Sequence, residues 1–173
     1  MLLPLACSSV DVKSQVDPQT NLKTYRTYAW APVRSDTTPG PGKNSILDKN
    51  IRGNLDLQFQ KIGLTQVSPN ENPDFLVVYY ASIQNRLTSN GGMSMGMGFG
   101  GPGWVGYSAP TVTEYQQGTL IVDFVHPGNH ENFWRGSASG TVDDSSHNQE
   151  NIQVAAQKLA AQFNKDRTKE QQG

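Results

Sequence analysis

The 173-residue sequence has one cysteine, almost no net charge and no long apolar run. A single cysteine, Cys7, excludes a disulfide within the chain. The formal net charge is -1 and the basic residues form no cluster, which argues against nucleic acid as a partner. No apolar stretch approaches the roughly eighteen residues that a membrane-spanning helix needs. The length suits one domain that buries its own core without disulfides.

The one cysteine stands in the sequence M-L-L-P-L-A-C-S-S at residues 1–9. A short apolar run, Ala6, Cys7 and then serines resemble the end of a bacterial lipoprotein signal peptide, where the thiol is acylated and the chain is cut before it. Pro4 stands where Leu is usual and no basic residue precedes the run, so we expect the upstream part of the signal to lie outside this sequence. The alternative is a cysteine without a role near a frayed terminus.

The spacing of apolar residues predicts six strands and two helices. Alternation and β-branched runs indicate strands at 10–16, 26–31, 64–67, 75–83, 111–125 and 132–142. Helical spacing indicates helices at 46–62 and 148–163. This order predicts an α+β, two-layer fold, in which a mostly antiparallel sheet of five to six strands carries both helices on one face. Residues 1–7 are then the signal-peptide remnant, 8–165 one domain and 166–173 a polar tail.

The first helix has the clearest boundaries. Ser45 is expected to cap it, with Asp48 reaching back as in a capping box, and Gly63 is expected to end it. Its predicted buried stripe consists of Leu47, Ile51, Leu55, Phe59 and Ile62. In the 132–142 strand, alternate small residues predict a face that a helix can approach closely. The Pro127-Gly128 pair predicts a type II turn before that strand.

Several segments, taken together and in order, resemble one family. They are V-D-P-Q-T-N-L-K-T-Y-R-T-Y-A-W-A-P, P-D-F-L-V-V-Y-Y, a glycine-rich loop, E-Y-Q-Q-G-T-L-I-V-D-F-V and F-W-R-G-S-A-S-G. They make the chain, over about residues 10–163, similar to the domain-of-unknown-function 4136 family of bacterial lipoproteins. The resemblance implies an exported, membrane-tethered α+β domain and no particular reaction. Two departures are the H-P-G-N-H turn, which lacks the expected acidic residues, and the last helix, which lacks a Phe-Pro stop.

Residues 90–107 contain eight glycines. A phosphate-binding loop is disfavoured because the stretch has no Lys and leads into a strand. Met93, Met95 and Met97 offer three thioethers, a ligand type that selects Cu(I). Alternatively the stretch is an interaction loop that presents its larger side chains to a membrane or a partner. Those side chains are Met97, Phe99, Trp104 and Tyr107. The plainest reading is an unstructured connection between two strands.

No catalytic pattern is visible in the sequence. His126, His130 and Asp123 are conceivable zinc ligands, but histidines beside a turn are usually solvated. Asp123 stands among apolar residues, and a cross-strand ion pair with Arg135 would account for both side chains. We therefore expect a non-enzymatic envelope lipoprotein with a binding or scaffolding role and no cofactor. Its expected partners are membrane lipid, through acylated Cys7, and an envelope protein.

We expect the protein to lie on the outer membrane facing the periplasm, with the inner membrane or the cell surface as alternatives. The alternative functions are an enzyme with an unrecognised site and a Met-rich Cu(I)-binding periplasmic protein. Each of these alternatives requires a different structural feature. An enzyme would need a cleft with perturbed titratable groups, and a copper protein would need its methionines to converge.

The first testable expectation concerns Cys7. When the protein is made with its native upstream region, intact-protein mass spectrometry should find a lipid-modified cysteine as the first residue of the mature chain. An unmodified Cys7 in the membrane-free periplasmic fraction would show that the L-A-C-S-S match is coincidental.

Overall fold

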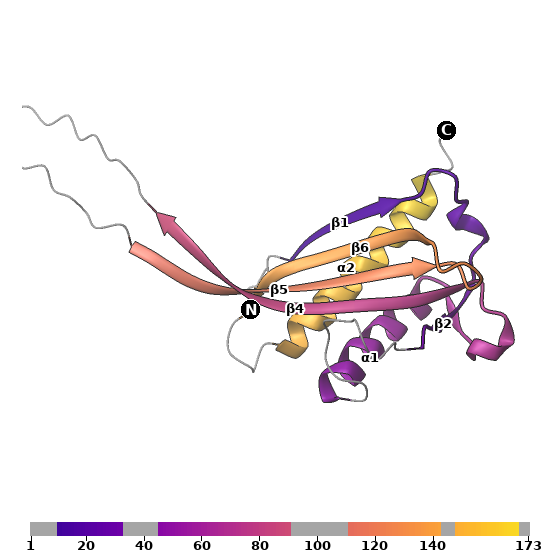
Figure 1. Ribbon diagram of the computed structural model, residues 1–173, viewed down its shortest axis with the longest axis horizontal. Coiled ribbons are helices and arrows are strands. Elements are labelled where there is room, and N and C mark those ends of the chain that lie inside the picture. The colour runs from indigo at the N-terminus through magenta and orange to yellow at the C-terminus, as the bar shows by residue number, and fades with distance from the viewer. Residues whose placement is uncertain (1–9, 33–44, 91–110, 143–147, 170–173) are drawn as a thin grey trace, which may run out of the picture.

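A computed structural model describes residues 10–32, 45–90, 111–142 and 148–169 of the chain. They form a six-stranded sheet with two helices on one face, as the sequence predicts (Figure 1). The strands are β1 (Asp11–Val16), β2 (Thr27–Trp30), β3 (Thr65–Gln66), β4 (Phe75–Asn90), β5 (Thr111–Val125) and β6 (Asn132–Val142). The helices are α1 (Ile46–Lys61) and α2 (Asn148–Lys169), and two short 3-10 turns are η1 (Leu22–Thr24) and η2 (Pro69–Glu71).

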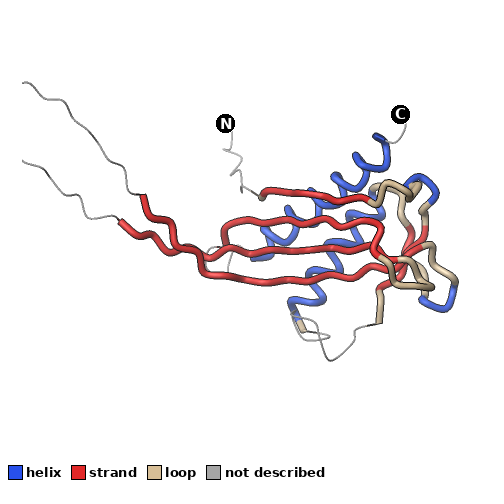
Figure 2. The backbone as a smooth tube through the Cα atoms, turned by 45° about the horizontal axis from the view of Figure 1, so that its top comes forward, coloured by secondary structure: helices blue, strands red, loops and turns tan. Residues whose placement is uncertain are grey.

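The strand order in the sheet is β1-β6-β5-β4-β2-β3. The pairs β1/β6, β5/β6 and β4/β5 are antiparallel, whereas β2 runs parallel to both β3 and β4. The sheet is therefore mixed, which refines the expected mostly antiparallel sheet. The parallel pairing follows from the crossover between β2 and β3, in which α1 returns the chain along the face of the sheet. Figure 2 shows both helices behind the same face.

Local chemistry sets the two ends of α1. The Ser45 hydroxyl accepts a hydrogen bond from the Asp48 backbone N–H at 3.0 Å, as expected for the cap. At the other end Gly63 has φ +83°, a left-handed conformation that favours glycine. Its N–H donates to the Gln60 carbonyl and the Leu64 N–H donates to the Phe59 carbonyl, both at 3.0 Å. This Schellman pattern ends the helix where the sequence predicts.

The predicted stripe of α1 is only partly buried. Ile51, Leu55 and Phe59 are buried in the core, but Leu47 in the first turn remains 39% exposed. The Asp48 side chain was expected to reach back in a capping box. Instead it is buried and accepts hydrogen bonds from Tyr79 of β4 and from Arg52. Asp48 therefore contacts the sheet, although its spacing from Ser45 had assigned it to the helix cap.

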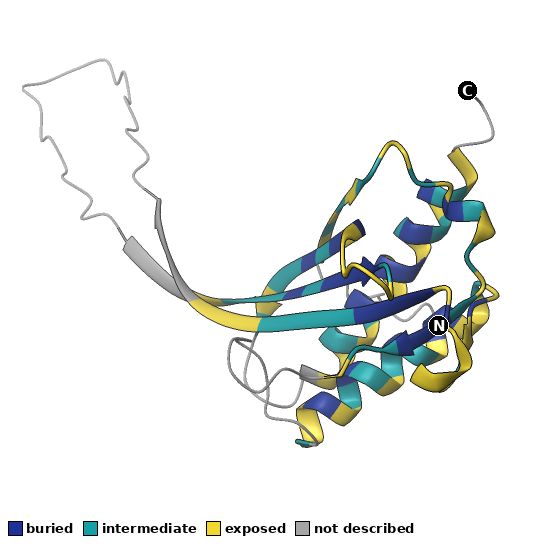
Figure 3. Ribbon diagram, turned by 45° about the vertical axis from the view of Figure 1, so that its right-hand side comes forward, coloured by how far each residue is buried: buried dark blue, intermediate teal, exposed yellow. Residues whose placement is uncertain are grey.

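The core lies between the helices and the inner halves of β4, β5 and β6, as the burial colours of Figure 3 indicate. Leu120, Val122 and Phe124 all face the helices, as alternation along β5 predicts. The small face of β6 admits α2 at Gly136. A β-carbon there would lie 2.8 Å from Leu159 Cδ2 and 2.3 Å from Trp134 Cη2, so any larger residue at this position would push the helix away.

The last helix is longer than its apolar spacing predicts. It continues to Lys169, six residues beyond the expected end at Phe163, because polar contacts hold its last turns. Buried Asp166 accepts hydrogen bonds from Trp134 Nε1 at 3.1 Å and from Gln162 Nε2 at 2.9 Å. The Arg167 guanidinium donates to the Ile62 carbonyl at the end of α1 at 2.7 Å. A pattern of apolar residues cannot detect such anchoring.

The turn between β5 and β6 differs from the expected type II turn. Gly128 is not among the described residues with positive φ; instead His130 has φ +57°. The His130 N–H donates to the His126 carbonyl at 3.0 Å, and the Asn129 side chain accepts from the Glu131 N–H at 3.1 Å. The side-chain amide of Asn129 thus helps to form a wider turn, which the Pro-Gly pair alone does not indicate.

The core position of Leu55 gives a direct test of this architecture. Leu55 is fully buried in the core cluster that α1 shares with the sheet. Leu55→Ala should lower the free energy of unfolding by about 2–5 kcal/mol, since it removes buried methyl groups and leaves a cavity. Denaturant melts measure this change, and a loss of less than about 0.5 kcal/mol would contradict the burial of this helix face.

Candidate functional site

Most of the sequence-predicted site residues lie outside the described residues. These are Cys7, the methionines Met93, Met95 and Met97, and the interaction-loop residues Phe99, Trp104 and Tyr107. Within the described ranges, no three His, Cys, Asp or Glu side chains gather as metal ligands would. The His126 ring packs against Phe133, with ring centroids 4.8 Å apart. None of the helices that the structure describes has the length and apolar character needed to cross a membrane.

Asp123 and Arg135 form the expected cross-strand ion pair. They are register partners on β5 and β6, and Arg135 Nε and a terminal guanidinium nitrogen donate to the two Asp123 carboxylate oxygens at 2.7 and 2.6 Å. The hydrogen bonds raise the pKa of the Arg135 guanidinium. The carboxylate is buried although alternation along β5 places it on the face opposite the helices. The charges of Asp123 and Arg135 are therefore paired with each other within the sheet.

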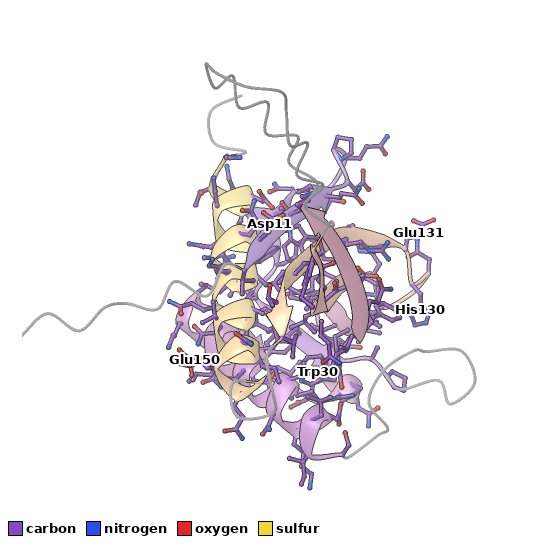
Figure 4. All side chains as sticks on the ribbon, turned by 90° about the vertical axis from the view of Figure 1, so that its left-hand side faces the viewer. Asp11, Trp30, His130, Glu131 and Glu150 are labelled. Atoms are coloured by element: carbon purple, nitrogen blue, oxygen red, sulfur yellow. The ribbon has the colours of Figure 1, made fainter. Side chains whose placement is uncertain are left out.

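A polar cluster that sequence reasoning missed joins α1 to the β2–β4 edge of the sheet. Asp56 accepts hydrogen bonds from the Tyr28 hydroxyl at 2.6 Å and from Trp30 Nε1 at 3.0 Å. One turn earlier in the helix, the Arg52 guanidinium lies 4.7 Å from the centre of the Trp30 ring. Figure 4 labels Trp30 near α1, and Asp11 on the opposite edge of the sheet.

The cluster continues along the helix. Arg52 Nε donates to Asp48 Oδ1 at 2.9 Å, and the Tyr79 hydroxyl of β4 donates to the same oxygen. Asp48, Arg52 and Asp56 recur every four residues of α1, so they form one row along the helix. In the sequence, this four-residue spacing of alternating charges is the signal that could have indicated the polar cluster. Only the fold could show that the row faces aromatic residues of β2 and β4.

The electrostatics of the cluster favour hydrogen-bond donation by its tyrosines. Burial, with the hydrogen bond to Asp56, raises the pKa of Tyr28 above its usual range. Burial and the bond to Asp48 raise the pKa of Tyr79 in the same way. Burial also raises the pKa of Asp56, although the Tyr28 and Trp30 bonds and the nearby Arg52 oppose that effect. Both phenols therefore remain protonated at neutral pH and hold the helix to the sheet.

An apolar groove opens beside the first turns of both helices. It has a volume of about 250 Å³ and is lined by residues of α1, α2, β4, β5 and β6 together with Val10, none of them charged. Its floor is a row of register partners, Ile83, Gly118 and Gly140. The small face of β6, which was expected to admit a helix along its length, does so at Gly136 but leaves this space at Gly140.

Beyond the groove, β4 and β5 continue as a two-stranded ribbon that projects from the sheet (Figures 1 and 2). β4 pairs with β2 only over Phe75–Val77, so within the described ranges its outer edge has no partner strand from residue 78 to residue 90. β5 pairs with β6 only as far as Gln116. Tyr115 on this ribbon is 36% exposed, and Ile83 of β4, where β5 is still paired with β6, is 59% exposed.

The backbone groups on the free edge of β4 can be identified residue by residue. The Val77 carbonyl accepts a hydrogen bond from the Ala31 N–H at 3.0 Å, on the β2 side of the strand. Backbone groups of alternate residues point to the same side of a strand, and the β4/β5 register is continuous. The N–H and C=O groups of Ile83 and Asn85 therefore point away from β5, along the unpaired edge.

Comparisons with known proteins bear on the family and the fold. The family model described as "Domain of unknown function (DUF4136)" matches residues 12–163. No curated protein matches the chain. Among solved structures, the chain is similar to a DUF4136 family protein from Bacteroides thetaiotaomicron, with 16% identity and a TM-score of 0.52 over 89% of this chain and 96% of that one.

Two other solved structures share the fold. A PelC dodecamer from Paraburkholderia phytofirmans is similar at 7% identity and a TM-score of 0.52, over 90% of this chain and 97% of that one. A PDZ domain protein from Parabacteroides distasonis is similar at 13% identity and a TM-score of 0.55, over 89% of this chain. The chain spans only 36% of the length of that protein. At such identities the likeness concerns the fold alone.

The raised pKa of Tyr28 predicts a loss of stability in alkali. Above pH 10.0, the ordinary pKa of a tyrosine, the unfolded chain releases this proton while the folded chain keeps it. The free energy of unfolding should therefore fall as pH rises, by up to about 1.4 kcal/mol per pH unit from this group. Tyr28→Phe should remove that part of the slope in denaturant melts between about pH 9 and 11. Equal slopes for the two proteins would contradict the buried Tyr28–Asp56 bond.

Proposed function

The chain belongs to the family described as Domain of unknown function (DUF4136), and on that basis we propose that it is a lipid-anchored envelope protein with a binding or scaffolding role. The anchor is the acylated Cys7 within L-A-C-S-S. Two residues, Ser8 and Ser9, separate Cys7 from Val10, where the described structure begins, so an anchor at Cys7 would keep the sheet close to the membrane. Ser8 rather than Asp after the cysteine favours the outer membrane.

The observation that carries the binding role is the projecting β4–β5 ribbon. An exposed strand edge offers a row of unpaired N–H and C=O groups, to which a partner can add a strand. Natural proteins usually protect such edges with charges, prolines or a covering segment. The stretch of β4 that leads into the ribbon, Ala81-Ser82-Ile83-Gln84, carries neither charge nor proline. We therefore assign the outer edge of β4 as the primary contact surface.

The glycine-rich stretch extends this surface. The register of β4 and β5 pairs Asn90 with Thr111, so the two ends of the stretch meet at the far end of the ribbon. We propose that Met97, Phe99, Trp104 and Tyr107, which lie outside the described residues, contribute to the same contact surface. Met and aromatic side chains suit adaptable contact surfaces. This arrangement favours contact with a partner over a Cu(I) site, for which three methionines would have to be ordered against the entropy of glycine-rich chain.

The non-enzymatic reading is supported by how the titratable groups are used. Asp123 is bonded to Arg135, Asp48 to Arg52 and Tyr79, and Asp56 to Tyr28 and Trp30. All of these contacts except the Asp48–Arg52 pair within α1 join different elements of the fold. The tyrosines with raised pKa remain proton donors, which does not suit a general base or nucleophile at neutral pH.

A second copy of the chain is one kind of partner that this edge could take. The PelC structure with the same fold is a dodecamer. Edge-to-edge pairing through β4 would join copies without altering the core. Sedimentation of the purified protein distinguishes this case from binding to a different envelope protein.

The proposal is tested by capture from envelope extracts with two variants. In one, residues 91–106 are replaced by a short glycine-serine linker; in the other, Asn85→Pro removes an edge N–H while leaving the β5 ladder intact. Both should keep a melting temperature close to that of the parent, because neither changes the core. Both should lose most of the captured partner or the self-association. Capture that both variants retain in full would contradict a contact through the ribbon.

A further inference from the structure

The apolar groove has the properties of a site for a hydrocarbon chain. None of the side chains that line it is charged, and its floor contains two glycines, Gly118 and Gly140, beside Ile83. Its volume of about 250 Å³ exceeds the roughly 150 Å³ of a cavity that holds benzene, and approaches the lower end, about 300 Å³, of small-molecule sites. Exposing such a surface to water costs about 25 cal/mol per Å². An apolar occupant is therefore favoured.

The chemistry of the adjoining segments narrows the choice of occupant. Three stretches outside the described residues, 1–9, 33–44 and 143–147, end within three positions in sequence of the lining residues Val10, Leu47 and Val142. Residues 33–44 carry a single aliphatic side chain besides prolines, and residues 143–147 carry none. Neither stretch supplies the apolar side chains that would fill the groove. The third stretch is the N-terminal one, residues 1–9, in which Cys7 lies three positions before Val10.

The geometry brings a lipid on Cys7 within reach. Val10 lines the groove, and its carbonyl accepts a hydrogen bond from Lys158 Nζ of α2 at 2.8 Å, which fixes the chain beside the groove. Three extended residues span at most about 10 Å. A hydrocarbon chain that begins at the Cys7 sulfur can therefore cross this distance and enter the groove with several methylenes.

We infer that the groove shelters one acyl chain of the lipid on Cys7 while the protein is away from a membrane. The inference rests on the proposed function in one respect, the acylation of Cys7. Binding of the acyl chain in the groove lowers the apolar surface area that the acylated protein exposes to water. The groove empties when the acyl chain enters a bilayer. The absence of charge along the lining suits an acyl chain and disfavours a polar peptide.

The probe for the test is isotope-labelled palmitate. The unacylated full-length chain carries Cys7→Ser, with Met1, Leu2, Leu3 and Leu5 removed or replaced by Ser so that no large apolar side chain before residue 7 can fill the groove. This variant should bind palmitate with a dissociation constant in the micromolar range. The acylated protein, purified without membranes, should bind it at least about tenfold more weakly, because its own acyl chain occupies the site.

A matched pair of substitutions localises the binding. Leu47→Glu places a carboxylate at the groove, and Leu57→Glu places one on the same helix away from it. The two leucines are 39% and 48% exposed, so both variants should fold, which melting curves check. In the unacylated background, Leu47→Glu should weaken palmitate binding by about tenfold or more, and Leu57→Glu should leave it unchanged.

Three results would overturn the inference, and they are distinguishable. No palmitate binding by the unacylated variant, or equal weakening by both glutamates, would show that the groove is not an acyl-chain site. Binding by the acylated protein as tight as by the unacylated variant would assign the groove to a free fatty acid instead. If mass spectrometry finds Cys7 unmodified, the protein has no lipid anchor at this position and the proposed occupant does not exist. The palmitate-binding measurement then still shows whether the groove binds an acyl chain.

Discussion

The helices of this protein are too short to cover its longest strands. α1 and β4 both contain 16 residues, but a helix rises about 1.5 Å per residue and a strand about 3.3 Å. The helix therefore spans about 24 Å and the strand about 53 Å. Helix cover ends partway along β4 and β5, the apolar groove opens where it ends, and the uncovered halves of these strands become the ribbon.

Stability is correspondingly concentrated at the covered end of the sheet. The Phe124 ring of β5 lies 5.5 Å from the Phe59 ring of α1 and 4.9 Å from the Phe163 ring of α2, measured between ring centroids. It also packs against Phe75 of β4 and Trp134 of β6, at 4.5 and 4.7 Å. One side chain thus joins both helices to three strands. Because this core lies far from the ribbon, the ribbon can change or bind without affecting the fold.

Much of this architecture is predictable from local pattern. The strands and helices appear in the expected order, Ser45 caps the start of α1, Gly63 follows its end, and Asp123 pairs with Arg135. These features depend on residues close in sequence or on simple alternation. The parallel pairing of β2, by contrast, depends on where the α1 crossover returns the chain, which no local spacing encodes.

The features that local pattern missed are polar contacts between distant elements. Asp48 binds Tyr79, and Asp166 accepts from Trp134, 32 residues away. In the sequence, Asp48 was assigned to the cap of the first helix and Asp166 to a polar tail. The groove was equally hidden, because it arises from Gly118 and Gly140 becoming neighbours across two strands. The methionines and aromatics of the glycine-rich stretch lie outside the described residues, and their role stays a prediction.

The central claim is that the free edge of β4 is the contact surface of an anchored protein. Site-specific photo-crosslinking in intact cells tests it most directly, with the reactive group placed in turn at Ile83 beside the free edge of β4 and at Gln157 on the exposed side of α2. The account predicts a discrete crosslinked species from position 83 and none from position 157. Crosslinks of equal yield from the two positions, or from position 157 alone, would contradict it.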